Sequence, residues 1–104
     1  MIKEKLVRDN IPEIIKKSGK TAIIRVAEDV EYKQFLFKKL LEEADELICS
    51  STNEDMINEI ADILEVIDAI KNTFALGQSA IDAAKLNKRN INGAFDKKYI
   101  LELE

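Results

Sequence analysis

Four carboxylates, arranged as two pairs on either side of one short polar segment, are the residues of this sequence best suited to chemistry. Glu43 and Glu46 form one pair with i, i+3 spacing, and Glu59 and Asp62 form the other. Side chains three residues apart are neighbours on the surface of an α-helix. If both pairs lie on helices, each helix presents two acids side by side, and clustered carboxylates are the ligands that hard metal ions such as Mg²⁺ prefer.

The apolar residues around each acidic pair recur with the period of an α-helix, which predicts two long helices. The first covers about residues 28–50 and the second about residues 54–75. On a helical wheel at about 100° per residue, Glu43 lies at the rim of the apolar face of the first helix, and Glu59 lies inside that of the second. Glu46 and Asp62, the second members of the two pairs, lie further from the centre of the apolar face. Both pairs are therefore expected at the edge of a buried face.

The polar segment at residues 50–53, SSTN, favours a turn, and Ser51 with Glu54 forms the expected capping box of the second helix. So short a connection favours an antiparallel hairpin. The midpoint between the two acidic pairs falls between Thr52 and Asn53, inside the turn, so the pairs are expected to lie level with each other. Four carboxylates at one partly buried level repel one another unless a cation neutralises them. The spacing therefore predicts a Mg²⁺ site, with Mn²⁺ as a substitute.

Shorter elements flank the hairpin in the expected fold. They are a helix over about residues 11–18 after a capping box at Asn10, extended segments at 21–26 and 99–104 that could pair as strands, and a helix over about residues 79–90 capped by Ser79. The expected class is mainly α, with a single domain at residues 1–104. One hairpin cannot cover the wide apolar faces of both long helices. We therefore expect a second copy of the chain to complete a four-helix bundle.

The composition excludes several other chemistries. The 104 residues contain no histidine and one cysteine, Cys49, which removes histidine bases, histidine-type zinc sites and an intrachain disulfide. Cys49 is expected to be buried near a helix end. A net charge of −4 argues against nucleic acid polymers as partners. The lone cysteine, the absence of an apolar run long enough for a membrane span and the absence of a signal-peptide core at the N-terminus favour a cytoplasmic location.

Three sequence elements, quoted below as four stretches, resemble the all-α nucleoside triphosphate pyrophosphohydrolases of the MazG-like superfamily. EEADE at 42–46, followed by EIAD at 59–62, is similar to the EExxE…ExxD signature of that superfamily. KLVRDNIPEII at 5–15 and KLNKRNINGAF at 85–95 resemble the opening and closing segments of a compact branch that is similar to phosphoribosyl-ATP pyrophosphohydrolase. Together these stretches extend over nearly the whole chain.

The resemblance implies roles for five acids and a reaction. Glu42 and Glu43 are the candidate catalytic residues, and the candidate metal ligands are Glu43, Glu46, Glu59 and Asp62. The implied reaction is hydrolysis of a nucleoside triphosphate, or a related nucleotide, between the α- and β-phosphates, and it could serve to remove unwanted nucleotides. The products would be a nucleoside monophosphate and pyrophosphate. Glu43 could also accept the proton of a metal-activated water.

The phosphates of such a substrate also require positive charge from the protein. Arg8 is one candidate, in the N-terminal segment. Three further candidates form one basic face of the last helix: Lys85, Lys88 and Arg89. The alternative for this face is an ordinary solvated helix end, where basic side chains suit the helix dipole.

Two other functions fit the same residues. Hydrolysis of phosphoribosyl-ATP in histidine synthesis would use the same bundle and the same acids. A non-catalytic helical interaction module would instead carry the acids as solvated surface residues. Metal dependence distinguishes the module from both enzymes, and the reaction products distinguish the enzymes from each other. Both enzyme hypotheses imply a nucleotide as ligand and a homodimer or homotetramer as the working assembly.

Overall fold

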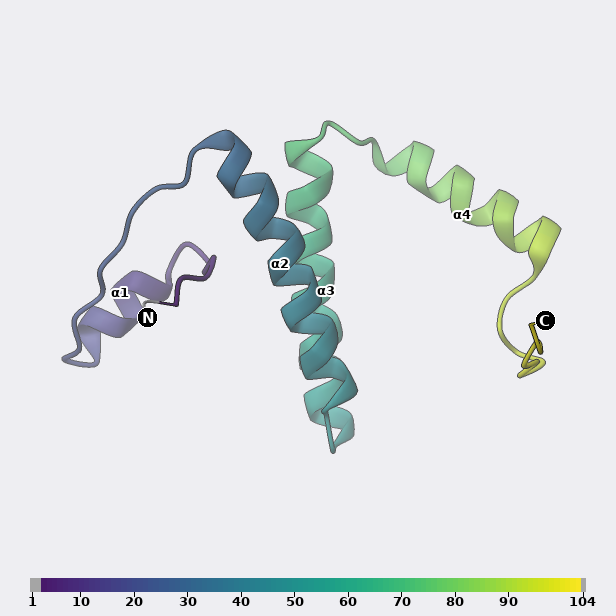
Figure 1. The fold of residues 1–104 in the computed structure, drawn as a ribbon, viewed down its shortest axis with the longest axis horizontal. Coiled ribbons are helices and arrows are strands. Elements are labelled where there is room, and N and C mark those ends of the chain that lie inside the picture. Colours follow the sequence, from purple (N-terminus) through teal and green to yellow (C-terminus); the bar gives the residue numbers. More distant parts are fainter. Residues whose placement is uncertain (1–2, 104) are drawn as a thin grey trace.

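The fold is mainly α-helical, as the apolar periodicity predicts. The computed structural model describes residues 3–103, which form the helices α1 (Ile11–Lys17), α2 (Asp29–Ile48), α3 (Asn53–Thr73) and α4 (Gln78–Asn92) (Figure 1). Within these residues no strand is formed, so the predicted pairing of residues 21–26 with the C-terminal segment is wrong. The physical reason is distance, because the two segments lie on opposite sides of the central helices. Glu104 lies outside the described residues.

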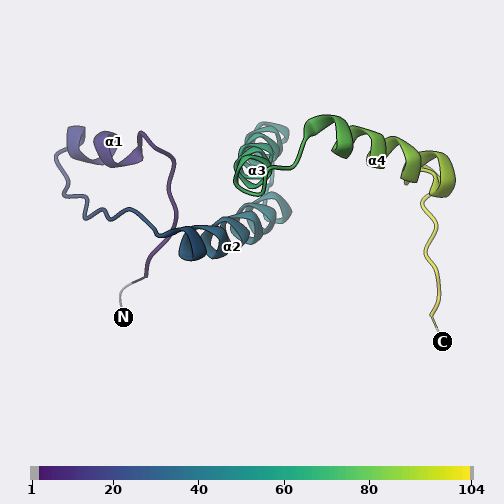
Figure 2. The same ribbon diagram turned by 90° about the horizontal axis from the view of Figure 1, so that it is seen from above.

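α2 and α3 form an antiparallel hairpin at the centre of the molecule and lie side by side in both views (Figures 1 and 2). α3 begins after Thr52, whose hydroxyl oxygen accepts a hydrogen bond of 3.1 Å from the backbone N–H of Asp55. The expected cap at Ser51 is therefore displaced by one residue. Leu36 of α2 and Val66 of α3 are the buried apolar side chains in the described part of the chain. The core of a single chain is consequently very small.

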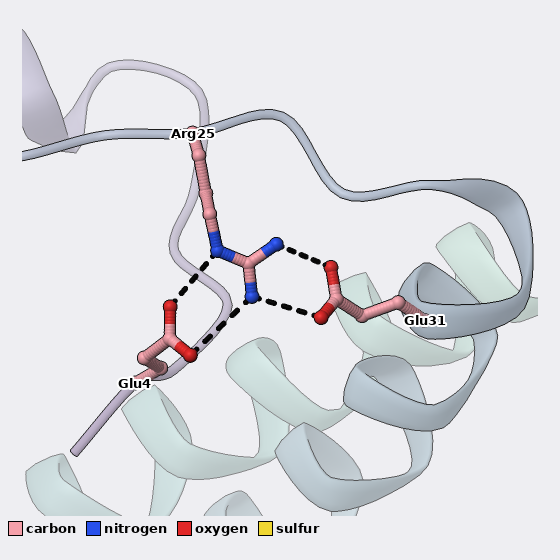
Figure 3. Close-up of polar contacts among 3 residues, drawn as sticks. All are labelled: Glu4, Arg25 and Glu31. Atoms are coloured by element: carbon pink, nitrogen blue, oxygen red, sulfur yellow. Dashed lines mark hydrogen bonds and ion pairs between the residues drawn. The ribbon is translucent and has the colours of Figure 1, made fainter. Parts of the chain in front are cut away.

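The N-terminal part of the chain lies on one side of this hairpin. Residues 3–10, called the arm from here on, lead into α1, and residues 18–28 return to the start of α2 (Figure 2). Arg25 in the returning segment donates hydrogen bonds to Glu4 of the arm, with Nε 2.9 Å from Oε2, and to Glu31 of α2, with Nη2 2.8 Å from Oε2 (Figure 3). This three-residue bridge, called the Arg25 clasp, fastens the arm to α2.

α4 extends away from the hairpin on the side opposite the arm (Figures 1 and 2). It ends at Asn92 because Gly93 adopts a positive φ of 84°, a conformation that glycine takes easily. The radius of gyration is 17.8 Å, whereas a compact domain of this length is expected to have about 13 Å. Large apolar side chains are left exposed along all three longer helices, for example Leu41, Leu64 and Ile91.

Three local expectations are wrong. Asn10 precedes α1 without a side-chain cap, and α4 begins after Gly77 rather than after Ser79. Gln78, at the start of α4, instead donates from Nε2 to the Oδ1 of Asp82 at 2.7 Å. Cys49 follows α2 and is exposed. Among residues 3–103, none of the helices combines the length and apolar character needed to cross a membrane.

Candidate metal centre

Three carboxylates meet where α2 and α3 face each other. Glu43 and Glu46 of α2 and Glu59 of α3 each place one carboxylate oxygen within 4.8 Å of those of the other two. We call these residues the Glu cluster. They come together because the two acidic pairs are equally distant from the turn. This part of the predicted site is therefore assembled as the spacing indicates.

Two members of the Glu cluster are withdrawn from solvent. Glu43 is only 5% exposed and Glu59 is half-buried, whereas Glu46 lies on the surface. The Oε2 atoms of Glu43 and Glu59 are buried and have no hydrogen-bond partner among the described residues. Ionised carboxylates can only accept hydrogen bonds, so neither of these side chains can satisfy the other. A shared proton or a bound cation would relieve the contact.

The pKa of Glu59 reflects this environment. It is raised from 4.5 to about 7, first by burial, then by hydrogen bonding to Glu43 and Glu46, and finally by repulsion from the same two carboxylates. Burial and negative neighbours both penalise the ionised form, while a hydrogen bond to the protonated form stabilises it. At neutral pH the Glu59 carboxyl is therefore divided between its two protonation states. A positive ion among the three side chains would favour the ionised form.

The geometry and chemistry of the Glu cluster fit a hard divalent cation. Mg²⁺ binds oxygen at about 2.0–2.1 Å, so ligands on opposite sides of the ion lie about 4.2 Å apart. The observed separations, which reach at most 4.8 Å, need only small side-chain movements to match. The unsatisfied oxygens of Glu43 and Glu59 face no competing protein donor. These three residues are therefore the ones that would hold the ion.

Asp62, the fourth predicted ligand, has a different partner. Nη2 of Arg8, in the arm, donates a hydrogen bond of 2.7 Å to Oδ1 of Asp62. Asp62 accordingly lies outside the Glu cluster, although it lines the same cleft as Glu43. The contact joins residues separated by 54 positions. Local spacing predicts the face on which Asp62 lies but carries no information about this partner.

Lys39 belongs to the site although the motif does not include it. Its Nζ lies 3.3 Å from Oε1 of Glu43 and 3.4 Å from Oε2 of Glu42, and its side chain is only 16% exposed. The signal that could have identified it is the i, i+3 and i, i+4 spacing to these two acids. Glu42 also pairs with Lys5 of the arm at 3.5 Å. Glu42, a candidate catalytic residue, is thus bound by two lysines and lies outside the Glu cluster.

A cleft of about 610 Å³ opens beside the Glu cluster, between the arm and the hairpin. Arg8, Glu43 and Asp62 line it together, so its wall carries both signs of charge. Tyr32 and Asn72 also line it and offer an aromatic ring and an amide. The volume lies within the range of about 300–1,000 Å³ that is usual for small-molecule sites. We refer to this feature as the cleft.

The Arg25 clasp holds the arm that forms one wall of the cleft. Hydrogen bonds from Arg25 lower the pKa of Glu31, and the bonds to Glu31 and Glu4 raise the pKa of the Arg25 guanidinium. Arg25 and Glu31 therefore stay charged at neutral pH. Leu6 and Val7 of the arm are only half-buried. Besides these side chains, the hydrogen bonds of Arg25 and the Lys5–Glu42 ion pair connect the arm to the helices.

The predicted basic face of α4 is remote from the acids in a single chain. Lys85, Lys88 and Arg89 are exposed, and none of them lines the cleft. α4 points away from the hairpin in both views (Figures 1 and 2). One chain alone therefore does not bring these three residues to the acids, and their role as phosphate ligands stays a prediction.

This chain is similar to part of a bacterial protein. It is 49% identical over 49 residues to an uncharacterised protein of Mycolicibacterium smegmatis, and the match covers 47% of this chain and 50% of that protein. The chain thus spans about half the length of the curated relative that it matches. It matches no family model and no solved structure.

Proposed function

We propose that this protein is a Mg²⁺-dependent nucleotide pyrophosphohydrolase. It hydrolyses a nucleoside triphosphate, or a related nucleotide, between the α- and β-phosphates, and releases a nucleoside monophosphate and pyrophosphate. The observation that carries the proposal is the Glu cluster, in which carboxylate oxygens lie within 4.8 Å of one another and two buried oxygens lack a partner. The resemblance of residues 42–46 and 59–62 to the MazG-like signature supplies the reaction.

The burial of these acids favours a binding site over solvated surface residues. A buried carboxylate oxygen without a partner loses its hydration and gains nothing in return. An acid on the outer face of a helix avoids this penalty, as the exposed Glu54 does at the start of α3. Glu43 and Glu59 instead face each other across the hairpin with unsatisfied oxygens. A cation bound by the folded protein at this place would offset the free-energy penalty of burying these oxygens.

The side chains around the Glu cluster have separate roles in this proposal. A bound Mg²⁺ supplies neutralisation of phosphate charge and acidification of water. Glu43, Glu46 and Glu59 hold the ion. Lys39, 3.3 Å from Oε1 of Glu43, fixes the orientation of that carboxylate. Because the sequence contains no histidine, a carboxylate such as Glu43 is the base available to accept a proton from the attacking water.

The cleft is suited to the rest of the substrate. Arg8 lies on its wall close to the acids, where a guanidinium can bind phosphate oxygens. The ring of Tyr32 offers a stacking surface for a base, and the amide of Asn72 offers both a donor and an acceptor. In this arrangement the phosphates would point toward the Glu cluster and contact Arg8. The nucleoside would lie in the cleft against Tyr32 and Asn72.

A second copy of the chain is part of the proposal. The chain exposes 9593 Å², whereas a folded monomer of its 11.8 kDa mass is expected to expose about 5,900 Å². The excess is several times the roughly 800 Å² that each partner buries in a standard interface. Exposed apolar side chains lie along both long helices, among them Phe37, Leu41, Ile60 and Leu64. Two hairpins packed as a four-helix bundle would cover these side chains.

Such an assembly also gives the basic face of α4 a role. α4 extends away from its own hairpin, so it can reach a neighbouring chain (Figures 1 and 2). Lys88 and Arg89 of one chain would then contact the phosphates bound beside the Glu cluster of the other. A symmetric pair of chains would contain two such sites.

The test is hydrolysis of a nucleotide panel in the presence of Mg²⁺, with phosphoribosyl-ATP included and pyrophosphate as the measured product. Glu43→Gln should abolish the activity because it removes an oxygen ligand without changing the size of the side chain. Glu54→Gln removes the same charge from an exposed site and should keep the activity. If no nucleotide yields pyrophosphate with Mg²⁺ or Mn²⁺, the proposal is wrong. Release of orthophosphate with a nucleoside diphosphate would contradict the assigned bond.

A further inference from the structure

We propose that Arg8 is an exchangeable partner of Asp62. It pairs with Asp62 while the site holds no metal, and it passes to the phosphates of the substrate once a divalent cation has taken Asp62. This inference rests on the proposed function and adds an order of events, in which the cation binds first and the nucleotide second. It also assigns Asp62 a place in the site, although it lies outside the Glu cluster.

The Arg8–Asp62 contact has the properties of an exchangeable ion pair. Nη2 and Oδ1 are 2.7 Å apart, yet the two side chains are 55% and 38% exposed. Exposed ion pairs contribute little net stability, because both charges are well hydrated when they separate. The loss of this contact therefore does not threaten the fold. Both side chains line the cleft, so each can find a new partner there.

Asp62 is positioned to join a cation held by the Glu cluster. It follows Glu59 by three residues on α3, so the two side chains are neighbours on the helix surface. Asp62 and Glu43 also line the same cleft. A divalent ion carries twice the charge of a guanidinium and attracts a carboxylate correspondingly more strongly. Binding of the ion therefore competes directly with Arg8.

Arg8 then remains in the cleft without its carboxylate and next to a positive ion. A phosphate group is the anion that the proposed substrate brings to this place, and guanidinium groups bind phosphate through two parallel hydrogen bonds. Lys39 is less free to make such a change, because it is only 16% exposed and lies between two carboxylates. The Arg25 clasp and the Lys5 ion pair keep the arm in place while Arg8 changes partner.

The exchange predicts opposite effects of one substitution on two ligands. Arg8→Gln should tighten binding of Mn²⁺ alone by about two- to fivefold, the range that corresponds to loss of a competing exposed ion pair. The same variant should weaken binding of the Mn²⁺ complex of inorganic triphosphate by roughly tenfold or more, because a charged hydrogen-bond donor to phosphate is lost. Electron paramagnetic resonance of free Mn²⁺ measures the first quantity, and titration calorimetry measures the second.

The controls distinguish exchange from other roles of Arg8. Lys16→Gln removes one positive charge from the exposed surface of α1 and should leave both affinities unchanged. In an Asp62→Asn background, Arg8→Gln should no longer tighten Mn²⁺ binding, since the competing pair is already lost. Circular dichroism verifies that each variant is folded.

Two results would overturn the inference. One is an Arg8→Gln variant that binds Mn²⁺ no more tightly than the wild type, and the other is a gain in affinity that persists in the Asp62→Asn background. The outcomes for the two proposals are separable. Opposite effects on Mn²⁺ and triphosphate without hydrolysis of any nucleotide would contradict the proposed function alone. Hydrolysis with an unchanged Mn²⁺ affinity in Arg8→Gln would contradict the exchange alone.

Discussion

Glu43 of α2 and Glu59 of α3 face each other across the hairpin, and each has one buried carboxylate oxygen without a hydrogen-bond partner. The two helices therefore pack around a contact that is unfavourable when both groups are ionised. A proton or a cation can relieve it. The stability of the hairpin should consequently depend on pH and on divalent metal in ways that can be measured without knowing the substrate.

In the absence of divalent metal, the protein should lose stability as the pH rises from about 5 to about 8. The pKa of Glu59 is about 7 in the folded chain and 4.5 without these neighbours, so the folded state binds the proton more tightly. This contribution is fully present below the unfolded pKa and is lost as the pH rises through the folded value. Thermal unfolding in a chelator, followed by circular dichroism at several pH values, measures the effect.

Glu59→Gln should remove most of this pH dependence, because glutamine does not ionise. Glu54→Gln changes an exposed acid on the same helix and should retain the slope of the wild type. An undiminished slope in Glu59→Gln would show that other groups cause the pH dependence.

Divalent metal should raise the melting temperature, and more strongly at pH 8 than at pH 5. Binding to the folded state alone stabilises it, by about 2.7 kcal/mol at a metal concentration one hundred times the dissociation constant. Metal must displace the proton of Glu59, so its affinity should weaken by up to about tenfold per pH unit below 7. Differential scanning fluorimetry with Mg²⁺ and Mn²⁺ provides the measurement. A melting temperature that does not respond to either ion at pH 8 would count against the Glu cluster as a metal site.

Lys39→Met should destabilise the metal-free protein, by about 1–3 kcal/mol at pH 8. The substitution keeps an unbranched apolar stem but removes the ammonium group, which lies 3.3 Å from Glu43 and 3.4 Å from Glu42. Added Mg²⁺ should restore much of the loss, because it compensates the same negative charge. Denaturant unfolding with and without Mg²⁺ tests both statements. Equal losses under the two conditions would mean that Lys39 stabilises the helix independently of the Glu cluster.

Arg25→Gln should loosen the arm without unfolding the hairpin. The guanidinium links Glu4 of the arm to Glu31 of α2, and none of these three residues belongs to α3 (Figure 3). Hydrogen exchange should accelerate in residues 4–10 and remain unchanged within the long helices. If the protein hydrolyses nucleotides, KM should rise more than kcat falls, because the arm forms a wall of the cleft. Lys20→Gln, on the same exposed segment, is the charge-matched control.

The features that could be predicted from the sequence are those with local causes. The period of the apolar residues determines the long helices, and the distance of each acidic pair from the turn brings Glu43, Glu46 and Glu59 together. Caps are less certain because neighbouring polar residues compete, and Thr52 caps α3 in place of Ser51. Ser51 and Thr52 are adjacent in the polar run at residues 50–53, and either side chain is chemically able to cap a helix.

The features that could not be predicted depend on contacts between distant parts of the chain. Asp62 is drawn to Arg8 only because the arm folds back along the hairpin, over a separation of 54 residues. α4 points away from the hairpin, a direction that its own amphipathic pattern does not specify. Residues 21–26 have the composition of a strand, but residues 99–103 lie on the far side of the molecule, so the two segments do not pair.

Complementation between two inactive variants should reveal whether α4 acts on a neighbouring chain. One variant carries Glu59→Gln and an intact α4, and the other carries Lys88→Ala with Arg89→Ala and an intact Glu cluster. Each should hydrolyse nucleotide poorly when alone. If α4 contributes to the site of its partner, a mixed dimer contains one site with both intact parts. Random mixing makes about half of the dimers mixed, so about a quarter of the wild-type activity should return.

The alternative arrangement predicts the opposite result. If α4 served the site of its own chain, every site in a mixed dimer would lack either the acid or the basic residues, and no activity would return. The variants must be unfolded and refolded together to allow exchange of subunits, and variants refolded separately before mixing provide the control. Sedimentation establishes that both form the same assembly as the wild type. Activity that returns only after joint refolding would identify Lys88 and Arg89 as residues supplied by the second chain, which a single copy holds away from its own acids (Figures 1 and 2).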